Sequence, residues 1–521
     1  TDYDMNNIPE FKRDMSVVHK EITDGINAAI EKGYNALKEN HHADYRPIFN
    51  RTSLSLGDNI TNDIPTDELR ATYKNTNNKM LEELFFQYGR YMLIASSRNG
   101  SLPANLQGVW NNSNSPSWGS GYTVNVNLQM NYWIAGAGNL KETIEPFIKY
   151  MSLLSKTGQE TAKIYYGIDN GGWVCHNGTD VFGYTGPRKE IRYGLSPGSS
   201  AWLCQNLWDF YEFTQDEEIL KEIYPIIKGN VLFMKEWLVE KDGKYVTGPS
   251  ISPEQGPMLL GTKYDMQLVY ELFTNFLKSA ELMNETDTEL INDVEYKKAN
   301  MKSPWEIGTS QNGQLMEWDM DIDGDMYERG FQSDGTPHRH VSHLMALFPT
   351  AQINKNTPAL MNAAKRTLNL RGDEATGWSR AYKTIFWARA IGDDGSGTNT
   401  RSADRAYKIF QGQLNDSTYA NLFDTHPPFQ ADGNYGASAA ICEFLVQSGT
   451  GDIDILPSLP TAWKEKGEVS GIATRGGFNL DIAWEHGKAT KINVLSTAGN
   501  QCILSYPYFT SDVKIMSNGA E

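Results

Sequence analysis

Apolar residues recur at helical spacing along most of the first 450 residues. The range 79–97 is the clearest case, because its apolar positions repeat every three or four residues and predict an amphipathic helix. The same pattern predicts further helices over 9–38, 128–157, 199–214, 216–239, 264–284, 287–301, 338–347, 356–370, 378–392, 401–413 and 434–447. Residues 40–75 are polar and interrupted by Pro, Asn and Asp, and they predict an extended crossing segment.

The helical ranges do not alternate with strands, so the pattern predicts a mainly α fold, a toroid in which inner helices alternate with outer ones. After residue 450 the pattern changes. Residues 467–484 alternate apolar and polar positions between glycines, and residues 492–508 are rich in β-branched side chains. We expect a linker helix region over 1–40, a helical barrel over 41–450 and a small antiparallel β-domain over 451–521.

Composition excludes several classes of partner. The formal net charge of −17 argues against nucleic acid, because a phosphate backbone requires a basic surface. No apolar run approaches membrane-spanning length, so we expect no membrane insertion. The chain starts at Thr1 with neither an initiator Met nor a signal-peptide pattern. We therefore expect that a preceding segment has been removed, and the sequence leaves the compartment open.

An uncharged, amide-rich segment spans residues 122–133. It contains three asparagines and a glutamine beside aromatic residues. Amides supply directional neutral donors and acceptors, and aromatic rings supply flat apolar faces. This combination predicts a pocket for a neutral polyhydroxylated ligand. The alternative is a buried amide network that only ties loops together.

Two acidic residues stand in loops with unusual surroundings. Glu254 lies between Pro253 and Gly256, which predicts a rigid turn that displays its carboxylate, and it is our candidate general acid. Asp432 precedes the last predicted helix and is the candidate second carboxylate, although it could simply cap that helix. Two carboxylates beside a hydroxyl-binding surface are what glycoside hydrolysis requires.

The segment 338–343 contains three histidines and an arginine. His340 and His343 would share one face of the predicted helix, which leaves a metal site as an alternative. No carboxylate or cysteine stands at matching spacing, so we favour contacts to sugar hydroxyls or to a carboxylate. We expect neither a metal nor another cofactor. Weaker candidates for the rim or core are the ranges 317–318 and 378–380, whereas Asp180 lies in another polar loop with a structural role as its alternative.

Several motifs together resemble glycoside hydrolase family 95, the inverting 1,2-α-L-fucosidases and related α-L-galactosidases. The resemblance covers nearly the whole chain and is carried by LPANLQGVWN, NVNLQMNYW, GSSAWLCQNLWD, SPEQG, HRHVSHL, GWSRAYK, PPFQADGNYG and LPSLPTAWKEKGEVSGIATRGGF. It implies an N-terminal β-domain, a linker helix, an (α/α)6 barrel and a C-terminal β-domain. Since this chain starts near the linker, we expect the N-terminal β-domain to be absent from it.

The resemblance assigns roles to residues that match the family motifs. Glu254 matches the general acid, and Asp432 matches the acidic residue that activates water. Asn125 and Asn127 match the asparagines that position this water. Sugar-binding roles fall to Trp202, Arg339 and His340, and Glu190 is the nearest candidate for a further family glutamate.

One position departs from the fucosidase pattern. Fucosidases of this family carry a histidine two residues before the first catalytic asparagine, whereas this chain has Thr123. L-Fucose lacks only the C6 hydroxyl of L-galactose, and the smaller threonine leaves room and a partner for that hydroxyl. The resemblance also associates threonine here with α-L-galactosides, so Thr123 favours that sugar.

The leading hypothesis is an exo-acting, inverting glycosidase that removes α-L-galactose or α-L-fucose from an oligosaccharide or polysaccharide. The alternatives are a strict 1,2-α-L-fucosidase, a non-catalytic glycan-binding protein on the same fold, and a disaccharide phosphorylase. The family resemblance leads us to expect a secreted, periplasmic or cell-surface location.

Overall fold

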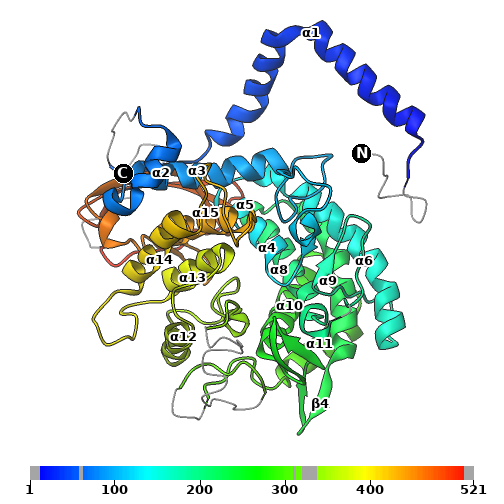
Figure 1. The fold of residues 1–521 in the computed structure, drawn as a ribbon. Helices are drawn as coiled ribbons and strands as arrows, with labels where there is room; N and C mark the ends of the chain where they lie inside the picture. Colours follow the sequence, from blue (N-terminus) through cyan, green and yellow to red (C-terminus); the bar gives the residue numbers. More distant parts are fainter. Residues whose placement is uncertain (1–11, 58–62, 189, 309–312, 320–336, 510–521) are drawn as a thin grey trace.

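A computed structural model describes residues 12–57, 63–188, 190–308, 313–319 and 337–509. Helices form the body of the molecule, and the first helix, α1 (Met15–Phe49), projects away from it (Figure 1). Asp14 caps the start of α1 by accepting a hydrogen bond from the backbone N–H of Ser16, and the helix bends at Gly33, where φ is 76°.

Four helices are buried on nearly every side and form the inner part of the body. They are α8 (Gly198–Thr214), α10 (Lys263–Leu282), α13 (Gly377–Arg389) and α15 (Asp432–Leu445). Every residue of α13 is buried. A helix that is enclosed all round belongs to the interior, so these helices form the inner ring.

Amphipathic helices pack around this ring. They are α3 (Lys79–Ser96), α6 (Glu145–Tyr166), α9 (Glu217–Trp237), α11 (Thr288–Ala299), α12 (Pro358–Arg371) and α14 (Ser402–Asp416). Helix α9 contacts α8 and α10, α14 contacts α13, and α3 contacts α15. The alternation of inner and outer helices confirms the predicted helical toroid. Within the described residues, no helix is long and apolar enough to cross a membrane.

Two of the predicted helices are wrong. The range 128–157 is divided into α4 (Asn127–Asn131), α5 (Trp133–Ala137) and the start of α6, because the chain turns at Gly138 and at Asn139, where φ is 58°. The range 338–347 contains only a 3-10 turn, η3 (Ser342–Leu344). There the His338 ring accepts the backbone N–H of His340, which offers the backbone a partner other than a helical carbonyl.

The extended segment expected over 40–75 is also wrong in part, because it holds the end of α1, the strand β1 (Ser53–Ser55) and α2 (Thr66–Thr76). Its polar residues are compatible with helices that face water. The sequence did not predict two short hairpins, β4 (Val239–Lys241) with β5 (Lys244–Val246) and β6 (Ser250–Ser252) with β7 (Gln255–Leu259). It also did not predict that β2 (Tyr122–Thr123) pairs antiparallel with the distant strand β3 (Gly178–Thr179).

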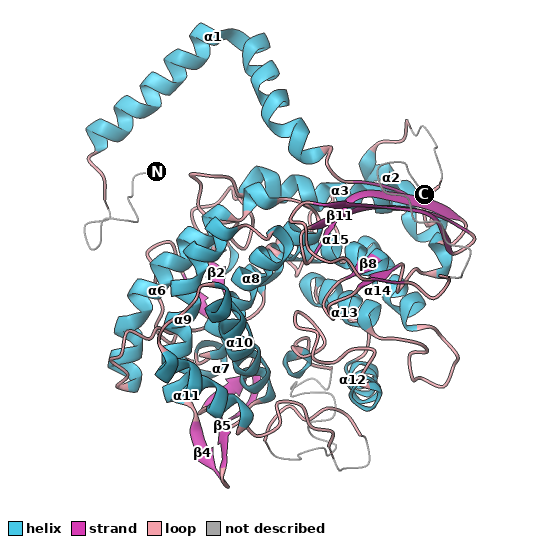
Figure 2. Ribbon diagram, turned by 180° about the vertical axis from the view of Figure 1, so that it is seen from behind, coloured by secondary structure: helices cyan, strands magenta, loops and turns pink. Residues whose placement is uncertain are grey.

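The antiparallel sheet predicted near the C-terminus is confirmed. Its strands are β10 (Lys466–Thr474), β11 (Phe478–Glu485) and β12 (Lys488–Ser496), and β1 pairs with β10 to give the order β1-β10-β11-β12. A second sheet joins β8 (Val446–Gln447), β9 (Ile453–Ile455) and β13 (Leu504–Ser505). The four-stranded sheet lies beside α3, which contacts β1, and its strand β10 contacts α5; α15 contacts β8 of the second sheet (Figure 2).

A partly buried ion-pair cluster joins this sheet to the inner ring. Arg475, in the turn between β10 and β11, donates to Asp209 over 2.8 Å and to Glu212 over 3.0 Å, and both acids belong to α8. Removing Arg475 would leave two partly buried carboxylates of α8 without this cation. The sheet and α8 are therefore fixed relative to each other.

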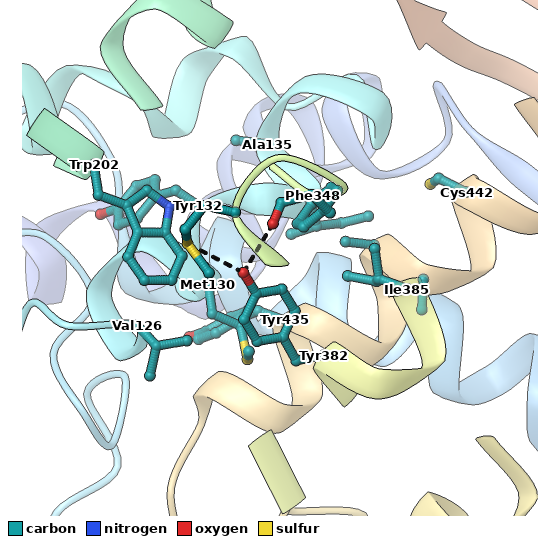
Figure 3. Close-up of a cluster of buried hydrophobic side chains, with 14 of the residues drawn as sticks. Val126, Met130, Tyr132, Ala135, Trp202, Phe348, Tyr382, Ile385, Tyr435 and Cys442 are labelled. Carbon is teal, nitrogen blue, oxygen red and sulfur yellow. Dashed lines mark hydrogen bonds between the residues drawn. The ribbon is translucent and has the colours of Figure 1, made fainter. Parts of the chain in front are cut away.

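Aromatic side chains fill the centre of the toroid (Figure 3). Tyr382 of α13 donates its hydroxyl to the carbonyl of Phe348 over 2.9 Å, and its ring centroid lies 6.3 Å from that of Trp202. The Trp133 ring also stacks with that of Trp202 at 6.3 Å, and it lies 4.9 Å from the ring of Tyr382. This packed layer supports the loops described next.

Candidate active site

Glu254 stands at the turn of the β6–β7 hairpin, outside any helix, as its proline and glycine neighbours predict. Two contacts fix the backbone of this turn. Arg192 donates Nε–H to the carbonyl of Glu254 over 2.7 Å, and the hydroxyl of Ser342 donates to the carbonyl of Pro253 over 3.1 Å. Arg192 and Ser342 thus hold the backbone of the turn that carries the Glu254 carboxylate.

Three side chains surround the Glu254 carboxylate. Asn125 Nδ2 donates to Oε1 over 2.9 Å, and the Arg339 guanidinium donates to Oε2. His340 Nε2 lies 3.6 Å from the same Oε2. The Glu254 side chain keeps 13% of its surface exposed, so the carboxylate can still be reached from solvent.

These neighbours determine the charge of Glu254. Burial by itself would raise the pKa of the carboxyl, but His340, Arg339 and the Asn125 amide favour the charged form more strongly. The pKa of Glu254 therefore lies well below its usual range. In the free protein at neutral pH the carboxylate is ionised.

Asp432 is the first residue of α15 and is completely buried. Asn127 Nδ2 donates to Oδ2, and the backbone N–H of Gly433 donates to Oδ1 over 2.9 Å. Burial raises the pKa of Asp432 to about 7, although both hydrogen bonds act in the opposite direction. Asp432 thus accepts one backbone N–H of the first turn of α15, so it acts in part as the helix cap that the sequence left open as an alternative. Its other oxygen accepts the hydrogen bond from Asn127, a catalytic candidate.

Asn125 and Asn127 diverge because the residues between and before them are anchored. Val124 and Val126 are buried in the core, and the backbone N–H of Val124 donates to the carbonyl of Asn177 over 2.7 Å. The two asparagines thereby face two different carboxylates. The amide of Asn125 also carries a buried oxygen that accepts no hydrogen bond from the described residues.

The alternative of a purely structural amide network holds for other members of the segment. Gln129 donates to the carbonyl of Val124 over 2.6 Å, and Asn131 donates to the carbonyl of Ala104 over 3.0 Å. These two amides tie backbone segments together. Asn125 and Asn127 differ from them, because their amides contact carboxylates.

The remaining predicted sugar-binding residues lie in different settings. Thr123 is half-buried in β2, opposite Gly178 of β3, two positions before Asn125. Trp202 is buried in the aromatic layer, and its indole N–H has no hydrogen-bond partner among the described residues. Glu190 is exposed just before the short helix α7 (Ile191–Gly194), and its carboxylate makes no hydrogen bond or ion pair that we observe within the described chain. The structure does not bring Glu190 to the two carboxylates.

A third buried carboxylate, Glu317, supports the site from behind. Arg371 donates to Glu317 over 2.5 Å and also to the carbonyl of His340 over 2.6 Å. Ser252 and Gln255, which flank the Glu254 turn, donate to the other oxygen of Glu317 over 2.5 and 2.8 Å. Although burial raises the pKa of Glu317, Arg371 and these donors lower it to about 2. The sequence predicts Glu317 only as a residue of the rim or core, and in the structure it is buried. The sequence pattern does not single out Arg371.

A further carboxyl that the sequence did not single out, Asp424, lies behind Asp432. A Cβ on Gly433 would lie 2.2 Å from Asp424 Cγ, so glycine is required for this approach. Burial, together with the nearby charge of Asp432, raises the pKa of Asp424 well above its usual value. This shift favours the neutral form of Asp424 beside the candidate base.

The histidines do not share a helix face, since 338–341 is not helical. His340 contacts Glu254, whereas His343 Nδ1 lies 3.5 Å from Glu317. Across the described ranges, no group of three or more His, Cys, Asp or Glu side chains is arranged to hold a metal ion. Arg339 and His340 contact a carboxylate, as one of the sequence interpretations proposed.

Comparison with known sequences identifies two matching family models. The glycosyl hydrolase family 95 catalytic domain matches residues 33–445, and the glycoside hydrolase family 95 C-terminal domain matches residues 447–521. The chain is 36% identical over 496 residues to "Alpha-L-fucosidase 2" of Arabidopsis thaliana, covering 92% of this chain and 57% of that protein. It is 34% identical over 497 residues to "Probable alpha-fucosidase A" of Aspergillus niger, covering 89% and 60%. The chain therefore spans less than two thirds of the length of these relatives.

Solved structures with little sequence similarity share the fold. A proposed kojibiose phosphorylase from the human microbiome superposes with a TM-score of 0.66 at 9% identity, covering 94% of this chain and 66% of that one. The GH78 family rhamnosidase of Bacillus sp. GL1 gives a TM-score of 0.51 at 9% identity, covering 88% and 43%. These likenesses concern the fold alone, and they agree with the expected (α/α)6 toroid.

The raised pKa of Asp432 predicts a pH-dependent cost to stability. An aspartate whose pKa is about 7 when folded and 3.8 ordinarily stabilises the fold when neutral, and this stability is lost as the pH rises towards 7. Asp432→Asn should therefore gain stability over the wild type by about 2–3 kcal/mol more at pH 8 than at pH 5. Denaturant unfolding at both pH values measures this difference.

Asp169→Asn is the matched control, because the Asp169 side chain is 69% exposed. It should change stability little at either pH. An equal effect of Asp432→Asn at pH 5 and pH 8 would contradict the raised pKa.

Proposed function

Because the chain belongs to glycoside hydrolase family 95, we propose that it is an exo-acting, inverting glycosidase that releases terminal α-L-galactose or α-L-fucose from oligosaccharides or polysaccharide side chains. One observation carries this proposal. Glu254 and Asp432, which are far apart in the sequence, are each bound by an asparagine of the segment 125–127. Two carboxylates that are bound by the same hydroxyl-binding segment supply the acid and the base of glycoside hydrolysis.

In this mechanism Glu254 protonates the oxygen of the leaving group. The carboxyl must be neutral for that step, whereas Arg339 and Asn125 keep it ionised in the free protein. A bound sugar offers hydroxyls to these same two side chains. When they bond to the sugar instead, the contacts that favour the charged carboxylate weaken, and the pKa of Glu254 rises towards the range of a general acid.

Asp432 acts on the attacking water together with Asn127. A carboxylate with a pKa of about 7 is a stronger base than an ordinary aspartate once it is ionised. The hydrogen bond from Asn127 polarises the amide, which can then orient the water and pass charge to Asp432 in the transition state. The unpaired oxygen of Asn125 supplies a further acceptor for the water or for a sugar hydroxyl.

The alternatives fit these contacts less well. A glycan-binding protein would need neither an acid nor a base. A phosphorylase would need a basic phosphate site near Asp432, but the hydrogen bonds that Asp432 receives within the described chain come from the neutral groups Asn127 and Gly433. Its family leads us to propose a secreted, periplasmic or cell-surface location for the enzyme.

The role of Glu254 predicts a dependence on the leaving group. Glu254→Gln should lower turnover at least about a hundredfold for a saccharide leaving group, because that oxygen needs protonation. An activated aryl glycoside barely needs it, so the loss there should be below about tenfold. Hydrolysis assays without phosphate measure both rates. Glu218→Gln, on the exposed surface of α9, is the control; equally small losses for both substrates would remove Glu254 from the acid role.

Thr123 predicts the sugar preference. If its small hydroxylated side chain accommodates the C6 hydroxyl, the wild type should prefer p-nitrophenyl α-L-galactoside over the fucoside. Thr123→His should reverse this preference, with a swing of about ten- to a hundredfold in the ratio of kcat/KM values. A wild type that strongly prefers the fucoside would support the alternative of a strict 1,2-α-L-fucosidase; the names of the two relatives mention an α-fucosidase.

A further inference from the structure

Trp118 presents its indole to solvent in a structured turn. It is the one exposed tryptophan in the part of the chain that the structure describes, with 49% of its surface exposed. Burying an indole is favourable, and large aromatic side chains dominate binding surfaces when they are left accessible. An exposed tryptophan in an ordered turn therefore suggests a ligand.

The backbone of this turn is strained in order to hold the indole outward. Trp118 has φ 52° and Ser120 has φ 47°, in the left-handed region that residues with a Cβ avoid. Specific contacts maintain this conformation. Ser120 Oγ donates to Asn105 Oδ1 over 3.0 Å, and the backbone N–H of Leu106 donates to the carbonyl of Gly121 over 3.2 Å. Strain that the surroundings maintain in this way is concentrated at functional sites.

The Trp118 turn also contacts the segment 426–431, which leads to Asp432 of the candidate active site. The centroid of the Trp118 ring lies 5.1 Å from that of the half-buried His426. Burial lowers the pKa of His426, its contact with the Pro427 carbonyl raises it, and the charges of Arg339 and Glu254 have smaller effects. On the other side, the carbonyl of Leu106 accepts the backbone N–H of Ala431, next to Asp432, over 2.8 Å.

We propose that Trp118 and His426 bind the leaving group, a neutral hexopyranose attached through the oxygen that Glu254 protonates. This proposal rests on the proposed hydrolase function. The leaving oxygen must lie within hydrogen-bond reach of Glu254, and the rest of the leaving group must extend from there towards solvent. In this proposal Trp118 and His426 lie on that route. The indole suits the C–H face of a pyranose, and the imidazole can bond to one of its hydroxyls.

The test compares two substrates that share the α-L-sugar and differ in the leaving group. One is a disaccharide in which the sugar is linked to galactose, and the other is the corresponding α-L-glycosyl fluoride, whose leaving group is too small to reach Trp118. Trp118→Ala should reduce kcat/KM for the disaccharide at least about tenfold more than for the fluoride. Trp118→Phe should lose less, because it keeps an aromatic face.

Tyr165→Ala is the matched control, since Tyr165 is a 58% exposed aromatic residue on α6. It should affect the two substrates alike. Equal losses for both substrates in Trp118→Ala would overturn the proposal, as would the absence of any loss. If the wild type hydrolyses neither compound, the hydrolase proposal fails separately. Calorimetric binding of the disaccharide then decides the role of Trp118: weaker binding by Trp118→Ala supports it, and unchanged binding overturns it.

Discussion

The site depends on two amide–carboxylate hydrogen bonds made from one short segment. Asn125 holds Glu254, 129 residues away, and Asn127 holds Asp432, 305 residues away. A buried carboxylate without donors is costly, so each acid requires its asparagine as much as the asparagine requires a partner. Asn125 and Asn127 are two positions apart at the start of α4. The backbone there therefore determines how far apart Glu254 and Asp432 are held. The hairpin of Glu254 and the start of α15 must both fit that spacing.

The same arrangement gives the two acids different properties. Glu254 lies beside Arg339 and stays charged, whereas Asp432 lies among neutral groups and has a pKa of about 7. Pairs of carboxyls with environments this different are typical of enzymes that use one as an acid and one as a base. Here the free protein holds Glu254 in the charged form, whereas the proposed acid role needs a neutral carboxyl. In the proposed mechanism, substrate contacts with Arg339 are therefore part of catalysis, and they link binding to the protonation of Glu254.

Sequence alone predicted the toroid and the C-terminal sheet, because long amphipathic helices and alternating strands leave strong periodic patterns. It predicted the Glu254 turn from its proline and glycine neighbours. It could not predict that His340 lies outside a helix, since this follows from a side-chain bond to His338 and from the distant Arg371. The Glu317–Arg371 pair and β1 in the sheet were missed for the same reason: they are contacts between distant parts of the chain.

The central claim is that Glu254 and Asp432 act on opposite sides of the sugar, with a water molecule between the base and the anomeric carbon. Proton NMR of the first product released from an α-L-glycoside tests this claim most directly, before mutarotation mixes the anomers. A single displacement predicts that the β-L-anomer forms first. Initial release of the α-L-anomer would mean a covalent intermediate and a retaining mechanism, and it would contradict the roles assigned to Asn127 and Asp432.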